Sequence, residues 1–586
     1  MAGRKRPRAT SLRRPDGAVK SGLPQPWAGH RQWTVLQGGF GLGLEFLALW
    51  RAWLTDEGRP GLLHFAVVEP NPVGAEDILR AAEAFSELQP LARDLAGQWF
   101  GLAPGIHRLA FAEDRVLLTL AIGEPLAALK SLNLRADALL LGAAPWDVPF
   151  LAGAAGLCRR GAHVEAHNLS ADTRLQLVQL GFEFEGESPH GRFSPRWPSR
   201  RDNDGAAAQE PADCVVIGAG LAGAAAAASL ARRGWNVRVL DAAAEPAAGA
   251  SALPVGLMAV HTSIDDNLLS RLTRCGARIT LQQAALLLAE GRDWAPCGVL
   301  ERQEDTALPT EPLANPGLRA WTTPATDAQK AAGGLSADAG AWWHERSAWI
   351  RPAALVRAWL AQPGVTFHGG RTVEHVEQTG AGWRVTDAQG RPLAEAALVV
   401  LAAGLASAQW LRGEIVLRPV RGQVSYGPVP AGVADLAPFP INGNGHFVPR
   451  VPTAEGPIWL TGSSYGRGDA DVSPRMADRL DNLRRLSELA PRAAEVLAPR
   501  FDTDAVRDWS GVRCVARDRR PLLGEVRSGL WVSTAMGSRG LTFAALCGEL
   551  LAARLHGEPW PLSRRLAQAL DVGRLGPAPR PASGAR

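Results

Sequence analysis

Residues 213–241, "DCVVIGAGLAGAAAAASLARRGWNVRVLD", constrain the fold of this chain more than any other stretch. The eighteen residues from Cys214 to Ala231 carry no charge, so a membrane span has to be considered first. A spanning helix needs about twenty consecutive apolar residues, and here three glycines interrupt the run near its start. The β-branched "CVVI" predicts a buried strand, "AGAAAAASLARRG" predicts a helix that stops at Gly234, and "WNVRVLD" predicts a second strand. The stretch is therefore predicted to be a strand–turn–helix–strand unit and not a membrane helix.

The glycine spacing in this unit is typical of a dinucleotide-binding turn. Gly218 allows the tight turn, Gly220 lets the backbone approach a pyrophosphate, and Gly223 lets the helix pack closely against the strand. The helix N-terminus offers free N–H groups and a positive dipole end to the phosphates. Asp241, at the end of the second strand, is predicted to accept hydrogen bonds from the adenosine ribose.

A second glycine turn lies upstream, in "WTVLQGGFGLGLEFLALWRAWL". A short strand leads into Gly39, Gly41 and Gly43, an amphipathic helix follows, and the next strand, "LLHFAVVEP", ends at Glu69. Glu124 in "LLTLAIGEP" and the strand in "ADALLLGAAP" extend the pattern. This arrangement is typical of a nucleoside-binding βαβ unit. A structural domain with glycine turns and no ligand is the alternative.

Linker-like composition divides the chain. Residues 185–212 are rich in Pro, Ser, Gly and charge and have no apolar period, which predicts a linker. The expected parts are a basic flexible arm at 1–30, a first domain at 31–184, the linker at 185–212, a second domain at 213–575 and a tail at 576–586.

Charge and cysteine usage limit the partners. The net charge of +5 permits a polyanionic partner without requiring one. The first twenty residues carry seven Lys or Arg and one Asp, which suits either a solvated tail or an arm that touches phosphate. No apolar stretch follows them, so we expect no secretory signal. The six cysteines form no C-x-x-C pair, and "HVEAH" (163–167) has the alternation of a strand face, so we expect a cytoplasmic protein without a metal site.

Three further segments are predicted to surround the dinucleotide. The small residues Gly249, Ala250 and Ser251 allow the backbone to pass close to a cofactor, and "VVLAAG" is a buried strand that ends at Gly404. The C-terminal "LWVSTAMGSRGLTFAALCGELLAARLHG" predicts a strand, a glycine turn and a helix that begins near Leu541. A helix N-terminus beside the N1–C2=O edge of a flavin stabilises the reduced ring. The predicted contacts in this turn are Gly537, Ser538, Arg539, Gly540 and Leu541.

Taken together, residues 213 to about 570 resemble the FAD-dependent amine oxidases of the glycine/sarcosine and D-amino-acid oxidase superfamily. The stretch "GVRCVARDRRPLLG" (511–524) is similar to the superfamily segment in which an arginine holds the substrate carboxylate. The resemblance assigns this role to Arg513, whose planar guanidinium suits a two-bond grip on a carboxylate. A structural ion pair is the alternative for Arg513.

The resemblance narrows to the MnmC family of bifunctional tRNA wobble-uridine enzymes. "RPVRGQVS", "GSSYGRGD", "DRRPLLG" and "GSRGLT" resemble its oxidase half, and "GGFGLGLEFL", "LHFAVVEP" and "RADALLLGAAP" resemble its methyltransferase half, in the same order. The implied fold is α/β, with an N-terminal Rossmann-like methyltransferase domain and a C-terminal FAD-binding Rossmann domain that carries an inserted mixed α+β substrate domain. The implied substrate is tRNA, at the anticodon wobble uridine, and Tyr465 is a candidate substrate contact, with a packing role as the alternative.

In that family the oxidase uses FAD to remove the carboxymethyl group from 5-carboxymethylaminomethyl uridine. The methyltransferase half then methylates the resulting amine with S-adenosylmethionine. The implied contacts of that second cofactor are Gly39, Gly41, Gly43, Glu69 and Glu124.

The N-terminal half departs from the family pattern. The family turn resembles E-T-G-F-G-T-G, whereas this chain has "QGGFGLG", and the family strand D-A-x-F-L-D-G-F-A-P is replaced by "DALLLGAAP". Asp137 matches the first aspartate, but the second, which lies beside the methyl-accepting amine, is missing; Asp147 could replace it only in a rearranged loop. Our hypothesis is that this domain is a degenerate methyltransferase that serves as a tRNA-docking or structural module. The sequence leaves open whether the domain still binds S-adenosylmethionine.

Two other functions remain open from the sequence. The first is a small-molecule amine oxidase of the glycine/sarcosine type with a non-catalytic N-terminal domain. The second is a nucleotide-binding RNA scaffold without catalysis. A tRNA substrate needs a basic rim around the flavin, for which "RPVRGQ", "VRDWSGVRCVARDRR" and "GSRG" supply arginines. No motif indicates an oligomeric state or a covalent flavin.

Overall fold

The computed structural model describes residues 26–142, 146–166, 169–197, 209–303, 315–380, 382–411, 415–431 and 436–575. The predicted tail at 576–586, most of the basic arm at 1–30 and part of the linker at 185–212 lie outside these residues. The chain forms two compact units. The first comprises Met1–Leu102, Leu109–Lys130 and Arg135–Asp202, and the second comprises Ala103–Arg108, Ser131–Leu134 and Asn203–Arg586. Within the described residues, no helix has both the length and the apolar character needed to cross a membrane.

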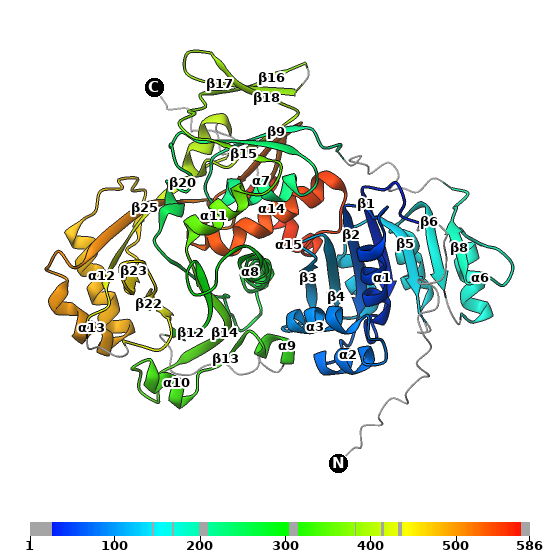
Figure 1. Ribbon diagram of the computed structural model, residues 1–586, viewed down its shortest axis with the longest axis horizontal. Coiled ribbons are helices and arrows are strands. Elements are labelled where there is room, and N and C mark those ends of the chain that lie inside the picture. The colour runs from blue at the N-terminus through cyan, green and yellow to red at the C-terminus, as the bar shows by residue number, and fades with distance from the viewer. Residues whose placement is uncertain are drawn as a thin grey trace, which may run out of the picture. The chain divides into compact units, whose positions relative to one another are not determined.

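The N-terminal unit is built on an eight-stranded sheet in the order β3-β4-β2-β1-β5-β6-β8-β7 (Figure 1). The strands β1, β2, β4, β5 and β6 are parallel, and β8 runs antiparallel to β6 and β7. Their bounds are β1 Gln32–Gly38, β2 Leu62–Glu69, β3 Gly105–Phe111, β4 Val116–Ile122, β5 Ala136–Leu141, β6 Cys158–Ala166, β7 Phe182–Phe184 and β8 His190–Phe193. The helices are α1 Leu44–Thr55, α2 Ala75–Ala82, α3 Gln89–Gln98, α4 Pro125–Ser131, α5 Val148–Ala155 and α6 Ala171–Gln179.

This sheet has a topological switch point. From β1 the chain proceeds to β2 and β4 on one side and to β5 and β6 on the other, and ligands of such sheets bind beyond the carboxyl ends of the strands at this reversal. The turn with Gly39, Gly41 and Gly43 follows β1 at that position. Strand β8 lies inside the stretch predicted as a linker. Its short sequence, His190–Phe193, buries only Phe193 and so shows no apolar period.

The second unit contains a six-stranded sheet in the order β15-β10-β9-β19-β27-β26, in which only β26 is antiparallel. The bounds are β9 Asp213–Ile217, β10 Asn236–Leu240, β15 Val365–His368, β19 Leu398–Leu401, β26 Leu522–Arg527 and β27 Leu530–Thr534. The predicted strand, helix and strand at 213–241 are thereby confirmed as β9, α7 (Leu221–Ala231) and β10.

Helix α7 packs against the C-terminal helix α14 (Gly540–His556), as Figure 1 shows. The two backbones approach closely because α7 is rich in alanine and because Gly548 faces it. A Cβ at Gly548 would lie 2.7 Å from the carbonyl oxygen of Ala225. The buried Arg233 donates to Glu549 and Glu558 and ties the end of α7 to α14.

A second, mixed sheet has the order β11-β14-β12-β21-β22-β23-β20-β24, with β13 on β14 and β25 on β20. Its strands are β11 Gly256–Met258, β12 Trp294–Arg302, β13 Thr322–Pro324, β14 Ala341–Ile350, β20 Arg418–Pro428, β21 Ile441–Gly443, β22 Gly445–Val451, β23 Ile458–Gly462, β24 Gly466–Arg467 and β25 Arg507–Val515. A small sheet comprises β16 His375–Thr379, β17 Gly382–Thr386 and β18 Pro392–Ala396. The longer remaining helices are α8 Leu268–Leu287, α11 Pro352–Leu360, α12 Met476–Leu489 and α13 Pro491–Leu497, and the short ones are α9 Pro316–Arg319, α10 Asp327–Ala332 and α15 Arg564–Gln568.

The sequence led us to expect one inserted substrate domain. In the structure two separate stretches build the mixed sheet: β11 to β14 lie in the chain between β10 and β15, and β20 to β25 lie between β19 and β26. The parallel pairing of β12 with β21 joins the two stretches, through Leu300 with Ile441 and Glu301 with Asn442. Such long-range pairing leaves no local signal in the sequence.

Candidate active site of the C-terminal unit

One large cavity of about 1260 Å³ lies in the C-terminal unit. Its wall combines the carboxyl ends of β9 and β10, the start of α14 and one face of the mixed sheet. Every residue that the sequence predicted for the FAD and substrate sites lines this cavity, except Gly223. The lining members are Gly218, Gly220, Asp241, Gly249, Ala250, Ser251, Gly404, Tyr465, Arg513, Gly537, Ser538, Arg539, Gly540 and Leu541.

Two of the three glycines in this turn, Gly218 and Gly223, leave no room for a side chain. Gly218 has a φ of +109°, and a Cβ there would lie 2.6 Å from the carbonyl oxygen of Ala402. A Cβ at Gly223 would lie 1.8 Å from the carbonyl oxygen of Gly218, which explains why Gly223 packs helix on strand and does not line the cavity. At Gly220 the nearest atom to a Cβ is Ser251 Oγ, at 3.1 Å, so this glycine keeps backbone accessible at the cavity wall.

The acid after the second strand is held in place by backbone. Asp241 accepts hydrogen bonds from the N–H groups of Ala219 (2.6 Å) and Ala243 (2.8 Å), and it lies in the cavity wall. Ser251 Oγ accepts the N–H of Leu221 at the start of α7, at 3.0 Å. The cavity is larger than ordinary small-molecule sites, which measure roughly 300–1,000 Å³. Together with the glycine turn and with Asp241 as a candidate ribose contact, this volume fits a bound FAD and part of a substrate.

Arg513 lies on β25 among partners that fix its guanidinium. Its Nη2 donates to Ser463 Oγ, its Nη1 lies 3.5 Å from the carbonyl oxygen of Arg421, and its Cζ lies 5.5 Å from the ring centroid of Tyr465. Burial lowers the pKa of Arg513, and the neighbouring Tyr465 opposes this shift. A guanidinium still has no accessible neutral form, because its pKa remains far above neutrality. No carboxylate pairs with Arg513 among the described residues, so a buried positive charge faces the cavity without a counter-ion.

Gly422 creates the space for this guanidinium. It lies on β20 beside the strand that carries Arg513, and a Cβ at Gly422 would lie 2.4 Å from both Nη1 and Nη2 of Arg513. The sequence analysis did not select Gly422, although "RPVRGQ" contains it. The reason for a glycine here is a contact between neighbouring strands, which sequence spacing does not reveal.

The cavity also holds polar residues that the sequence analysis missed. Glu301, Asn442, His446 and Gly462 occupy one row across β12, β21, β22 and β23. The first three line the cavity, and the row reaches Ser463, which contacts Arg513. Asn442, His446 and Gly462 lie on three consecutive antiparallel strands, whereas Glu301 comes from a distant part of the chain and joins the row only through the pairing of β12 with β21.

Glu301 remains ionised in this wall. Burial raises its pKa, but hydrogen bonds from His344 (3.1 Å), Asn442 (2.9 Å) and Gln303 (2.8 Å) outweigh burial and bring the pKa to about 2. His446 is neutral, because burial and the positive charge of Arg513 lower its pKa to about 4. This part of the cavity wall therefore combines the negative Glu301, the positive Arg513 and the neutral imidazole of His446.

In the N-terminal unit, the three turn glycines have φ values of +77°, +56° and +77° at Gly39, Gly41 and Gly43. Glu69 is the last residue of β2 and accepts the N–H groups of Phe40 and Asn71, both at 2.8 Å. Glu69 is thus adjacent to the glycine turn, as predicted. Glu124 is exposed and accepts the N–H groups of Leu126 (3.0 Å) and Ala127 (2.7 Å) at the start of α4, which is a capping role.

Trp146 lies on this glycine turn. A Cβ at Gly38 would lie 2.7 Å from Cζ2 of the indole, and one at Gly39 would lie 3.6 Å from it. The indole stacks on Phe150 with a centroid distance of 4.3 Å, and its Nε1 is buried without a hydrogen-bond partner. Residues 143–145 of the "DALLLGAAP" stretch lie outside the described residues.

Both remaining aspartates, Asp137 and Asp147, make structural contacts. Asp137 lies near the amino end of β5, accepts the N–H of Thr34 at 2.9 Å and pairs with Arg159 at 3.0 Å. The turn lies at the carboxyl end of β1, at the opposite edge of the sheet. Asp147 Oδ1 accepts the N–H of Phe150 at 2.9 Å and caps α5.

Comparisons with known proteins also assign an FAD-dependent oxidoreductase to the residues that form the cavity. The family model described as "FAD dependent oxidoreductase" matches residues 213–554. The chain is 46% identical over 581 residues to the tRNA 5-methylaminomethyl-2-thiouridine biosynthesis bifunctional protein MnmC of Polaromonas naphthalenivorans (strain CJ2), covering 94% of this chain and 91% of the relative. It is 45% identical over 626 residues to the protein of the same name from Verminephrobacter eiseniae (strain EF01-2), covering 96% and 99%.

Among solved structures, glycine oxidase from Geobacillus kaustophilus matches with a TM-score of 0.48 and 20% identity, over 59% of this chain and 95% of that chain. The sequence relatives cover almost the whole chain at well above 30% identity, and the family model covers its C-terminal half. The chain therefore belongs to the MnmC family, and its residues 213–554 form an FAD-dependent oxidoreductase domain.

Proposed function

We propose that this protein acts in tRNA 5-methylaminomethyl-2-thiouridine biosynthesis, as the FAD-dependent oxidase that removes the carboxymethyl group from 5-carboxymethylaminomethyl uridine at the wobble position. The observation that carries the proposal is the Arg513 guanidinium, which lies in the same cavity as the dinucleotide cradle and has no carboxylate partner among the described residues. The substrate supplies the missing counter-ion, because its arm ends in a carboxylate next to a secondary amine.

The residues divide the work between them. The cradle of Gly218, Gly220 and Asp241 would hold the adenosine and pyrophosphate, and Arg513 would bind the arm's carboxylate through two charge-assisted hydrogen bonds. When bound, FAD supplies the two-electron acceptor for the C–H bond between amine and carboxylate. Oxidation converts the C–N single bond to an imine, and water then breaks that bond to give the aminomethyl base and glyoxylate.

His446 contributes to the electrostatics of the site. Because His446 stays neutral, it places no second positive charge near Arg513. Arg539, at the start of α14, also faces the cavity, and its pKa is lowered by burial but raised by Glu301 and Tyr465. Both arginines give the cavity positive charge, which favours an anionic substrate group.

We infer further that the N-terminal unit does not transfer a methyl group. The support is the position of Trp146 on the glycine turn, the capping role of Glu124 and the structural contacts of Asp137 and Asp147. A nucleoside cofactor would need the surface of Gly38 and Gly39 that the indole covers. The parts proposed are a methyltransferase-like domain at 31–184, to which the pairing of β8 (His190–Phe193) adds the next strand, and an oxidase domain at 213–575.

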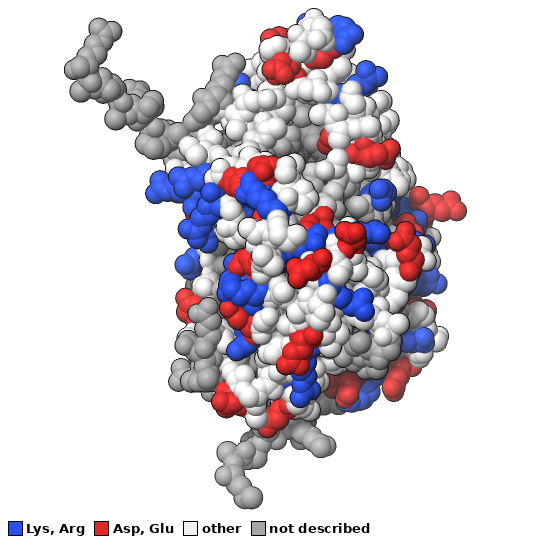
Figure 2. All heavy atoms as spheres, turned by 90° about the vertical axis from the view of Figure 1, so that its left-hand side faces the viewer, with Lys and Arg blue, Asp and Glu red and all other residues white. Residues whose placement is uncertain are grey.

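One face of the molecule carries charges of both signs (Figure 2). On the face drawn in Figure 2, Lys and Arg alternate with Asp and Glu, and basic side chains gather at one edge of the view. The proposed tRNA partner is therefore argued from family membership and from the site, and not from the charges on this face.

The test is mass spectrometry of nucleosides from tRNA rich in 5-carboxymethylaminomethyl uridine, after incubation with the FAD-loaded protein and S-adenosylmethionine. We expect the modified uridine to disappear, with 5-aminomethyl uridine as the product, and we expect Arg513→Met to leave it unchanged while retaining FAD. Unchanged tRNA with the wild-type protein would contradict the oxidase proposal. Turnover of sarcosine at the same rate as tRNA would favour the small-molecule oxidase, and a methylated product would contradict the inference on the N-terminal unit.

A further inference from the structure

Tyr465 is an unusual member of the cavity wall. Among the residues that the structure describes, four Phe, Tyr or Trp side chains line the cavity: Trp410, Tyr465, Trp509 and Phe543. Phe543 and Trp410 are buried and Trp509 is half-buried, whereas 42% of Tyr465 is exposed. An exposed aromatic ring in the wall of a binding cavity is a surface for a flat ligand group.

One side of this ring is already occupied. The Cζ atom of Arg513 lies 5.5 Å from the ring centroid, in the range of a cation–π contact. Arg513 is in turn held by Ser463, two residues before Tyr465. The ring and the guanidinium of Arg513 are thus in contact, while 42% of Tyr465 stays exposed in the cavity wall.

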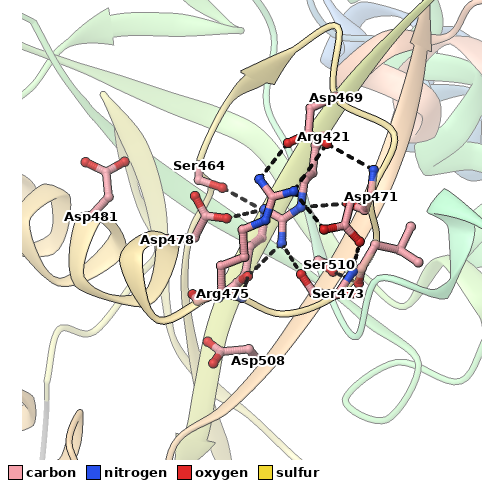
Figure 3. Close-up of polar contacts among 12 residues, drawn as sticks. Arg421, Ser464, Asp469, Asp471, Ser473, Arg475, Asp478, Asp481, Asp508 and Ser510 are labelled. Carbon is pink, nitrogen blue, oxygen red and sulfur yellow. Dashed lines mark hydrogen bonds and ion pairs between the residues drawn. The ribbon is translucent and has the colours of Figure 1, made fainter.

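The segment that carries Tyr465 is held by polar contacts. We call residues 463–475 the strap; apart from Ser464, which is buried, it is exposed or half-exposed. Figure 3 shows Arg421 reaching into it from β20. Arg421 is only 1% exposed, donates to the carbonyl oxygens of Asp471 (2.7 Å) and Ser473 (2.5 Å), and pairs with Asp478.

Other contacts complete this anchoring. Gln423 exchanges two hydrogen bonds with the backbone of Arg475, at 2.8 and 2.9 Å. On the surface, Arg475 pairs with Asp469 at 2.6 Å and with Asp471 at 2.8 Å (Figure 3). The strap is therefore preorganised without burying its own apolar side chains, and Tyr465 is presented at the cavity with little entropy left to lose on binding.

We propose that the exposed face of Tyr465 is the stacking surface for the pyrimidine base of the substrate nucleoside, while the arm of that base reaches Arg513. This inference rests on the proposed function and adds how the base itself is recognised. Single-stranded RNA bases are commonly splayed out and stacked on aromatic side chains. Each such stack contributes roughly 1–3 kcal/mol, which corresponds to about 5- to 150-fold in affinity.

The experiment compares two substitutions of different shape and one matched control. Tyr465→Phe keeps the ring, and Tyr465→Leu keeps an apolar side chain without a ring. Tyr426→Leu changes the only other tyrosine of the chain, which packs against an apolar cluster on β20 and does not line the cavity. Initial rates of loss of 5-carboxymethylaminomethyl uridine are measured against tRNA concentration, with FAD content and Tm recorded for each protein.

Stacking contributes equally to the bound substrate and to the transition state, so it should appear in KM. We expect Tyr465→Leu to raise KM about 5- to 150-fold with kcat within threefold of wild type, and Tyr465→Phe to restore KM to within about threefold. Tyr426→Leu should leave both constants unchanged.

Three results would overturn the inference while leaving the proposed function intact. The first is an unchanged KM in Tyr465→Leu, and the second is an equal rise of KM in Tyr465→Phe and Tyr465→Leu. The third is a lower kcat at unchanged KM, which would show that Tyr465 acts by positioning Arg513. If the wild-type protein does not convert the tRNA, the proposed function fails and this inference fails with it.

Discussion

Among single residues, Gly422 has the most specific consequence for the site, because the guanidinium of Arg513 occupies the space of its missing side chain. A methyl group there would lie 2.4 Å from the two terminal nitrogens, so the flexible end of Arg513 must move. We expect Gly422→Ala to keep the fold and FAD but to raise KM for the carboxylate substrate by about 10- to 150-fold, as expected for a lost charge-assisted hydrogen bond.

Steady-state kinetics on modified tRNA measure this effect. Gly97→Ala is the control, because a Cβ at Gly97 meets nothing within 4 Å. An unchanged KM in Gly422→Ala would show that the position of Arg513 is not what binds the carboxylate.

His446 predicts a dependence of stability on pH. Its pKa in the folded state is about 4, because of burial and the charge of Arg513, compared with 6.5 for the free side chain. As the pH falls from 6.5 towards 4, the unfolded chain binds a proton that the folded chain does not, so the free energy of unfolding falls. The loss from this residue should be about 1–2 kcal/mol, after allowance for its partial exposure.

Urea unfolding of the C-terminal unit, followed by FAD fluorescence at pH 7 and pH 4.5, measures this contribution. The decrease in stability between the two pH values should be smaller in His446→Gln than in the wild type. Equal decreases would show that the imidazole is protonated in the folded protein.

At the scale of secondary-structure elements, the glycine turn between β9 and α7 combines two separate requirements. A Cβ at Gly223 would meet backbone at 1.8 Å, whereas one at Gly220 would meet only Ser251 Oγ at 3.1 Å. We expect Gly223→Ala to destabilise the C-terminal unit and to lower its expression as a soluble protein. We expect Gly220→Ala to retain Tm without cofactor but to lose FAD affinity at least tenfold, because the methyl group occupies the approach to the pyrophosphate.

Visible absorbance of the purified proteins and thermal unfolding of the FAD-free forms separate the two effects. Full FAD content in Gly220→Ala would contradict the assignment of this turn to the pyrophosphate.

The strap is anchored by the buried Arg421 in addition to Gln423 and the surface ion pairs of Arg475. Arg421→Met would leave Asp478 and the carbonyl oxygens of Asp471 and Ser473 without their partner. Removing one member of a buried ion pair typically costs about 3–5 kcal/mol. The strap carries exposed Arg467 and Arg475, so we expect trypsin to cut the variant within 463–475 under conditions in which the wild type stays intact. Arg484→Met, which removes exposed ion pairs on α12, is the control.

On the scale of the whole molecule, each of the two units has a largely parallel sheet with a glycine turn after its central strand, but the surroundings of the two turns differ. The C-terminal unit surrounds a large cavity, whereas in the N-terminal unit an indole covers the glycine turn. We expect no S-adenosylmethionine binding below about 1 mM in the wild type and at least tenfold tighter binding in Trp146→Ala, because this change uncovers Gly38 and Gly39. Isothermal titration measures both, and micromolar binding by the wild type would contradict the prediction.

The sequence determined the local units of this protein. Strand, glycine turn, helix, strand and acid are adjacent in the chain at Gly218 to Asp241 and again at Gly39 to Glu69, so their spacing predicts them, and the structure confirms these elements. The small-residue segments near Gly249, Gly404 and Gly537 were also predicted to meet the cofactor, and they line one cavity.

Only the tertiary structure decided the substrate side of the cavity and the state of the N-terminal turn. Glu301 meets Asn442 through register between strands that are 141 residues apart in the chain. Gly422 matters because of a side chain on the neighbouring strand, and the indole of Trp146 contacts Gly38 at the end of β1. None of these relations has a period or a spacing in the sequence, because sheet pairing and side-chain packing join positions that the chain keeps far apart.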